Sequence, residues 1–252
     1  MHTISVVIIT FNEEKNIERC IDSVKEVADE ILVVDSFSTD NTIAIAQRKG
    51  AIVHQEPFRG YIEQKNLALQ LSSHQYVLCL DADEALDEIL IKSITESKIK
   101  MYARAYSMNR CTNYCGRFIR TGLWYPDRKL RLFDKGIASW GGINPHDKVI
   151  LTQHVRIHHL RGDLLHYSYN SIEDHMIQNN KFSSISAQAL YAAGRRTNLF
   201  KIIFNPVWAF IHSYLLRFGF LDGFYGFIIA VNISHLTFLK HTKLMMLQRK
   251  NQ

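Results

Sequence analysis

The sequence predicts an α/β protein with a mostly parallel sheet, and three observations lead to this fold class. Apolar runs typical of buried strands alternate with helical segments over roughly the first hundred residues, as in parallel sheets with right-handed crossovers. After about residue 100 the chain carries short mixed segments, paired glycines and many aromatics, which predict an α+β extension with long loops. From residue 198 onward it is very apolar and aromatic, which predicts C-terminal helices.

The first strands are expected close to the N-terminus. Residues 4–9 (ISVVII) form a β-branched run that suits a strand buried on both faces. Asn12 is expected to cap the next helix, because acidic residues follow it and apolar residues then recur at helical spacing. Residues 30–35 (EILVVD) predict a second strand, and a polar turn leads from it into a helix that stops at Gly50.

The later elements are expected at wider intervals. Residues 51–54 predict a short third strand, 65–71 a helix and 76–80 (YVLCL) a buried fourth strand. Residues 171–193 have a helical pattern that ends near Gly194. The predicted fold therefore contains four parallel strands in the first half of the chain and a long helix in the second half.

Polar side chains stand where three of these strands end. They are Thr10, Asn12 and Glu13 after the first strand, Asp35 at the end of the second, and Asp81 and Asp83 after the fourth. Because ligands of open α/β sheets bind outside the carboxyl ends of the strands, we expect these side chains to share one site. Mg²⁺ is typically held by one or two carboxylates together with substrate phosphates. The pattern therefore predicts a divalent cation that holds a nucleoside diphosphate, although a polar loop with helix capping is the alternative for Asp81 and Asp83.

Several other kinds of site are not supported by the sequence. No G-x-G-x-x-G follows the first strand and no G-x-x-x-x-G-K-[ST] occurs, which argues against a dinucleotide enzyme and a P-loop ATPase. His154, His158 and His159 lie in a segment that alternates like a strand, and no H-E-x-x-H accompanies them. The four cysteines lack zinc-knuckle spacing and are expected to be reduced thiols.

The charge balance favours a partner that carries phosphate. The formal net charge is +6 and the sequence pI is about 9.1, which fits nucleotides, nucleic acid or an anionic membrane face. The basic residues are dispersed and accompany an apolar C-terminal region. We therefore rank nucleic acid last and expect none to bind. The sequence leaves the oligomeric state unknown.

The C-terminal region is expected to lie on a membrane surface. Residues 219–239 contain no Lys or Arg and one acid, Asp222, and are long enough to cross a bilayer. Their Gly, Asn, Ser and His content argues against a simple span, as do the polar residues of 199–218, and basic residues follow at 240–250. Interfacial helices on an anionic surface are favoured, with helices packed on the domain or at a dimer contact as the alternative.

The order of motifs resembles family 2 glycosyltransferases with a GT-A fold. The segments that carry the resemblance are residues 5–13 (SVVIITFNE), 34–40 (VDSFSTD), 65–68 (KNLA) and 80–84 (LDADE). The later chain is similar to one branch of the family, the lipopolysaccharide core β-glucosyltransferases of Gram-negative bacteria. The matching segments there are 124–127 (WYPD), 131–133 (RLF), 145–149 (PHDKV), 166–169 (HYSY) and 221–223 (LDG).

The resemblance implies donor-binding roles. Thr10, Asn12 and Glu13 occupy positions that line the nucleoside pocket in the family, and Asp35 matches the acid that meets the uracil. Lys65 falls near a basic position that contacts the donor, where an ammonium group suits phosphate.

The resemblance also implies metal-binding and catalytic roles. Asp81 and Asp83 match an Asp-x-Asp motif that binds Mg²⁺ or Mn²⁺, with Asp83 as the direct metal ligand. His166 corresponds to a late metal or diphosphate contact, with a core or loop histidine as the alternative. Asp147 stands in the place of the base that activates the acceptor, where the branch more often has Glu after His. The alternative for Asp147 is a cap or a pair with Lys148.

The aromatic residues and the arginines of the middle region can each be interpreted in two ways. Aromatic residues of the middle region either stack on sugar rings or belong to the core: Trp124, Tyr125 and Trp140. Arginines of the same region either contact phosphates of an acceptor or form a solvated face: Arg117, Arg120, Arg128 and Arg131.

The resemblance implies an inverting hexosyltransferase that moves glucose from UDP-glucose onto a heptose of the lipopolysaccharide or lipooligosaccharide inner core. Residues 1–100 would bind the nucleotide sugar, 101–170 the lipid A–core acceptor, and 171–252 the membrane. Such an enzyme is expected in the cytoplasm, peripherally associated with the inner membrane. The alternatives are transfer to a polyprenyl phosphate or another surface polysaccharide, and a non-catalytic membrane scaffold that binds sugar nucleotides.

Overall fold

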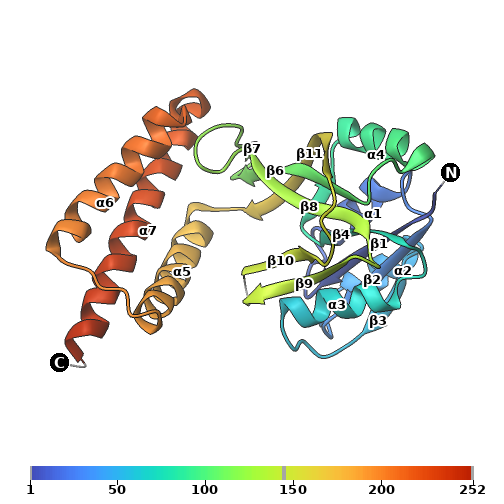
Figure 1. Cartoon of the computed structure of the whole chain (residues 1–252), viewed down its shortest axis with the longest axis horizontal. Coiled ribbons are helices and arrows are strands. Elements are labelled where there is room, and N and C mark those ends of the chain that lie inside the picture. Colours follow the sequence, from blue (N-terminus) through green and yellow to red (C-terminus); the bar gives the residue numbers. More distant parts are fainter. Residues whose placement is uncertain (1, 144–145, 251–252) are drawn as a thin grey trace. The chain divides into compact units, whose positions relative to one another are not determined.

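The computed structural model describes residues 2–143 and 146–250. The chain divides into two compact units, residues 1–110 with 127–167 and residues 111–126 with 168–252 (Figure 1). The division by function into residues 1–100, 101–170 and 171–252 remains a prediction.

The first unit begins with alternating strands and helices. They are β1 (Ile4–Thr10), α1 (Ile17–Val24), β2 (Glu30–Asp35), α2 (Thr42–Arg48), β3 (Ile52–Gln55), α3 (Tyr61–Leu71) and β4 (Tyr76–Asp81). The strands lie in the order β3-β2-β1-β4, and each neighbouring pair is parallel. The predicted parallel half of the sheet is therefore confirmed (Figure 1).

Antiparallel strands extend this sheet beyond β4. They are β5 (Glu84–Leu86), β6 (Ala105–Tyr114), β8 (Asp127–Asp134) and β11 (Ile157–Tyr169), in the order β4-β8-β6-β11-β5, and α4 (Glu88–Lys100) follows β5. Two further strands, β9 (Ala138–Ile143) and β10 (His146–Leu151), form a separate antiparallel pair. The expectation of long loops across this region is wrong. Antiparallel strands mix polar and apolar residues, as β8 (DRKLRLFD) does, so they lack the continuous apolar runs that reveal buried parallel strands.

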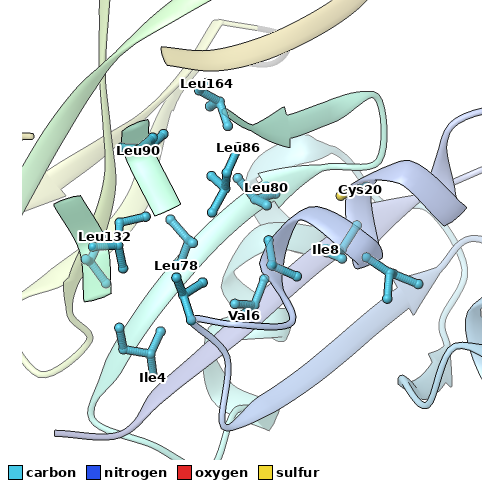
Figure 2. Close-up of a cluster of buried hydrophobic side chains, with 14 of the residues drawn as sticks. Ile4, Val6, Ile8, Cys20, Leu78, Leu80, Leu86, Leu90, Leu132 and Leu164 are labelled. Atoms are coloured by element: carbon cyan, nitrogen blue, oxygen red, sulfur yellow. The ribbon is translucent and has the colours of Figure 1, made fainter. Parts of the chain in front are cut away.

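The core of the first unit lies on both faces of β1 and β4. Ile4, Val6 and Ile8 are fully buried on one face of β1, and Val7 is buried on the other. Figure 2 shows the first of these faces, where apolar side chains of α1, β4, β5, α4, β8 and β11 surround the strand. A one-residue shift in register would move every side chain of β1 to the opposite face and disrupt the packing of both clusters, so the packing fixes the positions of the ends of β1 and β4.

The helix start predicted at Asn12 is wrong. Helix α1 begins at Ile17 after Asn16, while Asn12 has a φ of 53°, a left-handed conformation that asparagine tolerates. The Asn12 side-chain oxygen accepts a hydrogen bond of 2.8 Å from the backbone N–H of Thr39, in the turn after β2. This tertiary bond replaces the local cap and ties together the loops that follow β1 and β2.

The second unit is mainly helical. Its helices are α5 (Ile172–Ala192), α6 (Leu199–Ile211) and α7 (Gly223–Lys250), with the short turns η1 (His212–Leu216) and η2 (Gly219–Asp222) between the last two and a short strand, β7 (Arg117–Phe118), before them. Helix α7 packs against both α5 and α6. The helix predicted at residues 171–193 is confirmed, and the Ser171 and Asp174 side chains cap it reciprocally.

Trp124 lies in an aromatic cluster of this second unit. Its ring stacks on Tyr169 with centroids 5.3 Å apart and contacts Tyr114 and His175 edge-on. Because these rings pack on one another, Trp124 belongs to a partly buried aromatic cluster, as the core interpretation expects, and sugar stacking by Trp124 remains a prediction. Burial lowers the pKa of His175 to about 4, which keeps the imidazole neutral in this cluster.

Large apolar side chains are exposed on α6 and at the start of α7. Residues Leu199–Leu216 and Gly219–Lys250 are each long and apolar enough to cross a membrane by length and composition. The exposed side chains include Leu199, Phe200, Ile203 and Trp208 of α6 and Phe224 of α7, together with Phe218 and Leu221 between the two helices. Patches of this kind mark interaction surfaces, and the membrane-surface interpretation stays a prediction.

Candidate active site

The strand register brings the predicted strand-end residues of the first unit to one edge. Thr10 of β1 lies beside Asp35 of β2, and Ile9 lies beside Asp81 of β4. Asp83 follows Asp81 by two residues in the turn before β5. The expectation that the carboxyl ends of β1, β2 and β4 meet at one edge is therefore confirmed.

A cavity of about 580 Å³ opens at this edge, and we call it the donor cavity. It lies wholly in the first unit and is lined by Ile9, Thr10, Phe11, Glu13, Ser36, Phe58, Tyr61, Gln64, Asp81, Ala82, Asp83 and His166. Five of the predicted site residues are among these: Thr10, Glu13, Asp81, Asp83 and His166. The mixture of aromatic rings and carboxylates suits a ligand with both a planar ring and cation-bridged phosphates.

Asn12 and Asp35 are close by but do not line this cavity. The Asp35 side chain is 0% exposed and accepts hydrogen bonds from the N–H and hydroxyl of Ser38, the former at 2.8 Å. The Ser38 hydroxyl oxygen also accepts a 2.8 Å bond from the Asn12 N–H. In this arrangement Asp35 and Asn12 hold the loop that carries Ser36.

Asp83 and His166 face each other in the donor cavity. The Asp83 Oδ2 is 3.2 Å from the His166 Nε2, and the Asp83 carbonyl accepts a 2.9 Å hydrogen bond from the Tyr167 N–H, which fixes the turn against β11. Carboxylate oxygen suits Mg²⁺ and Mn²⁺, and imidazole is a common ligand of divalent metals. No group of three or more His, Cys, Asp or Glu with metal-binding geometry exists within residues 2–143 and 146–250. The protein side of such a site would be small, which fits a cation that keeps positions for phosphate oxygens and water.

Glu13 adds negative charge to the donor cavity. Burial raises its pKa, a hydrogen bond from Asn16 partly offsets this, and the charge of Asp83 raises it further. Two carboxylates that repel each other across a cavity favour a bound cation.

Lys65 links Asp81 to Asp147. Its ammonium group is 3.0 Å from Asp81 Oδ1 and 2.8 Å from Asp147 Oδ2, and it lies 4.5 Å above the Trp140 ring. Lys65 is only 5% exposed. Asp147 lies on β10 opposite Gly142 of β9, so the separate strand pair places it here. Asp147 belongs to the motif of residues 145–149, and Pro145 of that motif lies outside the described residues.

Arg131 holds the other oxygen of Asp81. Its Nη2 is 2.6 Å from Glu84 Oε1 and 3.1 Å from Asp81 Oδ2, and the other Glu84 oxygen accepts a 3.0 Å bond from the Asp81 N–H. Burial opposes ionisation of Asp81, but Lys65 and Arg131 outweigh it and hold the Asp81 pKa well below its usual range. The carboxylates of Glu84 and Asp81 likewise outweigh burial and raise the Arg131 pKa.

Glu84 and Arg131 are site residues whose role the sequence did not reveal. Glu84 was visible only as the acid after Asp83, and Arg131 had both a phosphate-contact and a solvated-face interpretation. Arg131 is buried, so the solvated face is wrong for it. The signal that was available is a single arginine within an apolar run (LRLF), which requires a buried carboxylate partner. Trp140 is buried beneath Lys65 and Arg131, so its ring is not open for sugar stacking.

We expect Arg131→Gln to lower the free energy of unfolding by about 3–5 kcal/mol, because it removes the nearest cation of buried Glu84 and leaves that carboxylate with the more distant Arg110, at 3.8 Å. Arg128→Gln is the matched control, since Arg128 is exposed on the same strand and should change stability by less than about 0.5 kcal/mol. Urea denaturation followed by circular dichroism measures both. Equal, small effects of the two substitutions would contradict the buried ion-pair assignment.

Comparison with known proteins identifies the family. Residues 5–192 match the family described as Glycosyl transferase family 2. An uncharacterized glycosyltransferase of Rickettsia typhi is 35% identical over 263 residues, which cover 100% of this chain and 90% of the relative. The lipopolysaccharide core biosynthesis glycosyltransferase LpsC of Rhizobium meliloti is 29% identical, over 96% of this chain and 91% of its own.

Among solved structures, glucosyl-3-phosphoglycerate synthase from Mycobacterium tuberculosis, in complex with Mn²⁺ and UDP-glucose, is similar at 28% identity. The similarity covers 44% of each chain with a TM-score of 0.37. The predicted α/β sheet followed by apolar C-terminal helices is confirmed. The family match over most of the chain, together with the Rickettsia relative, shows that this protein belongs to glycosyltransferase family 2.

Proposed function

We propose that this glycosyltransferase is an inverting, metal-dependent hexosyltransferase that moves glucose from UDP-glucose onto a heptose of the lipopolysaccharide inner core. The observation that carries the proposal is the chain of ion pairs Asp81–Lys65–Asp147. It starts at the donor cavity and ends at the carboxylate proposed as base. One continuous set of charges thus joins a site for the leaving group to a site for the attacking hydroxyl.

The donor side of the mechanism uses the donor cavity. The nucleoside lies against the aromatic and polar lining, with Thr10 and Glu13 in the pocket and Asn12 and Asp35 supporting its rim. Asp83 and His166 would hold Mg²⁺ or Mn²⁺, with Asp81 close by, and such a cation neutralises charge that develops on the diphosphate. Lys65 contributes a fixed positive charge beside it, and preorganised charges of this kind cost no reorganisation during the reaction.

The acceptor side uses Asp147. Its carboxylate accepts the proton of the acceptor hydroxyl while that oxygen forms a bond to the anomeric carbon of glucose. The bond between that carbon and the diphosphate oxygen breaks, and its electron pair stays on UDP. Attack from the face opposite the leaving group inverts the anomeric configuration. Lys65 holds Asp147 in place through their 2.8 Å contact.

Two observations support an acceptor made at a membrane. The relative named LpsC is described as acting in lipopolysaccharide core biosynthesis. The exposed aromatic residues of α6 and the basic end of α7 suit an anionic membrane surface. We therefore propose a cytoplasmic protein that associates peripherally with the inner membrane.

A donor panel tests the proposal. The full chain is incubated with Mn²⁺, a heptose-terminated core acceptor, and UDP-glucose, UDP-galactose or UDP-N-acetylglucosamine, and the products are identified by mass spectrometry. We expect addition of one hexose from UDP-glucose in the inverted configuration. Transfer to a polyprenyl phosphate instead of the heptose would favour the alternative acceptor. Failure to consume any donor would favour the non-catalytic scaffold.

A further inference from the structure

A second cavity of about 540 Å³ lies in the first unit and shares Asp81 with the donor cavity. We call it the basic cavity, because six cationic residues line it against two carboxylates, Asp81 and Asp147. The cations are Lys65, Arg110, Arg128, Lys129, Arg131 and Lys148. Such an excess of positive charge in a concave site raises the local concentration of anions.

Two of these cations have already been assigned to buried carboxylates. Lys65 is held by Asp81 and Asp147, and Arg131 by Glu84 and Asp81. Both are nearly inaccessible to solvent. They form the floor of the basic cavity and are not free to follow a ligand.

Arg110 and Lys129 share one carboxylate at the wall of the basic cavity. Arg110 Nη2 is 2.8 Å and Lys129 Nζ 3.0 Å from opposite oxygens of Asp127. Their side chains are 24% and 35% exposed. Lys129 and Arg131 are two residues apart on β8, and both line the basic cavity. Asp127 thus orients two partly exposed cations while neutralising only one positive charge.

Arg128 and Lys148 increase the excess of positive charge. Both are exposed, and no carboxylate of the described chain, residues 2–143 and 146–250, lies within ion-pair distance of either. Arg110 also lies 3.8 Å from Glu84, so four carboxylates (Asp81, Glu84, Asp127 and Asp147) offset four of the six cationic charges and the lining keeps an excess of two positive charges.

The position of Asp147 identifies the occupant. Asp147 lines the basic cavity but not the donor cavity, so a molecule in the basic cavity lies beside the proposed base. The donor diphosphate has its own place at Asp83 and His166. The remaining substrate of a glycosyl transfer is the acceptor.

We propose that the basic cavity binds a phosphate monoester carried by the acceptor saccharide, with Arg110 and Lys129 as its direct contacts. The proposal rests on the proposed function, because it takes Asp147 to mark the acceptor side. Guanidinium and ammonium groups suit phosphate, the first as a planar fork and the second as a point charge. The phosphate lies on the same sugar as the attacked hydroxyl or on its neighbour, because the base and the cations share one cavity.

A matched pair of acceptors tests the inference. Methyl heptoside and its O-phosphorylated counterpart are compared with the full chain, UDP-glucose and Mn²⁺, and the binding of each acceptor alone is measured by calorimetry. We expect the phosphorylated acceptor to bind and react at least about tenfold better, as hydrogen bonds to charged groups contribute about 1.5–3 kcal/mol. Equal binding and equal reaction of the two acceptors would overturn the proposal.

Substitutions locate the effect. Arg110→Gln and Lys129→Gln should each raise KM for the phosphorylated acceptor about tenfold. Neither variant should change kcat or the KM of the unphosphorylated acceptor appreciably. The melting temperature of Lys129→Gln should stay near that of the parent. Lys92→Gln, an exposed lysine of α4, is the charge-matched control and should have no effect. Equal effects of all three would overturn the assignment of Arg110 and Lys129.

The hydrolysis of UDP-glucose without acceptor separates the two proposals. If hydrolysis persists while both acceptors behave alike, the basic cavity has been misassigned and the proposed function stands. The opposite outcome is binding of the phosphorylated heptoside that Lys129→Gln weakens, with no consumption of donor. That outcome would support the phosphate site in the basic cavity and would contradict the proposed glycosyl transfer.

Discussion

Asp83→Ala is expected to lower kcat with UDP-glucose by at least about 10²–10³-fold, the usual cost of removing one electrostatic contact to a transition state. The variant keeps His166 but removes the carboxylate that is proposed to bind the cation directly. Asp83 is partly exposed, and within residues 2–143 and 146–250 its side chain forms an ion pair with His166 alone, so the fold should be retained. Release of UDP under saturating donor and Mn²⁺ measures the effect, and circular dichroism checks the fold.

Two variants make the result specific. Asp22→Ala removes an exposed carboxylate of α1 that forms ion pairs with Lys25 and Lys49, and it should leave turnover unchanged. Asp83→Asn keeps the shape but not the charge, and its affinity for UDP should lose most of its dependence on Mn²⁺. Near-normal turnover in folded Asp83→Ala would remove Asp83 from the metal site.

Asp147→Asn is expected to lower glycosyl transfer by about 10²–10⁴-fold, the range typical of a general base. Lys65 loses one of its two carboxylates but keeps Asp81 at 3.0 Å, so the donor cavity should keep its geometry. The dissociation constant of UDP with Mn²⁺ should therefore stay within about threefold of the parent value, since a contact to the donor is not removed. Transfer is followed by mass spectrometry and UDP binding by calorimetry.

Asp147→Glu is the matched control for this prediction. It restores a carboxylate on a side chain that is one methylene longer. Glu is the more frequent residue here in the lipopolysaccharide core branch that the sequence resembles. The variant should recover much of the transfer activity lost in Asp147→Asn. Transfer by Asp147→Asn at the rate of the parent would show that the base is another group.

The parallel half of the fold was predictable because its buried strands can be recognised from their sequences alone. β1 and β4 are buried on both faces, so their sequences are continuous apolar runs, and the polar residues after them must lie at one edge of the sheet. The antiparallel strands were missed for the complementary reason. β8 begins with three charged residues and places Arg131 between leucines, and a pattern of that kind does not distinguish a half-exposed strand from a loop.

The site residues that follow directly from the end of a strand could be predicted from the sequence. The ion pairs between residues far apart in the sequence could not. Asp81 and Asp83 come directly from their place after β4. The Lys65–Asp147 pair joins residues 82 apart and depends on the β9–β10 pair, and the Arg131–Glu84 pair joins residues 47 apart. The apolar run around Arg131 signals a buried carboxylate partner but does not identify Glu84, and the Lys65–Asp147 pair leaves no local signal. Asn12 shows the same limit, because its partner Thr39 lies in another loop.

A crystal structure with UDP and Mn²⁺ tests the central claim most directly, since the anomalous signal of manganese locates the ion independently of the nucleotide. We expect the ion to be coordinated by an Asp83 oxygen and by oxygens of the diphosphate, with the uridine in the donor cavity beside Thr10. An ion bound away from Asp83, or a nucleotide lodged outside the edge formed by β1, β2 and β4, would contradict the account.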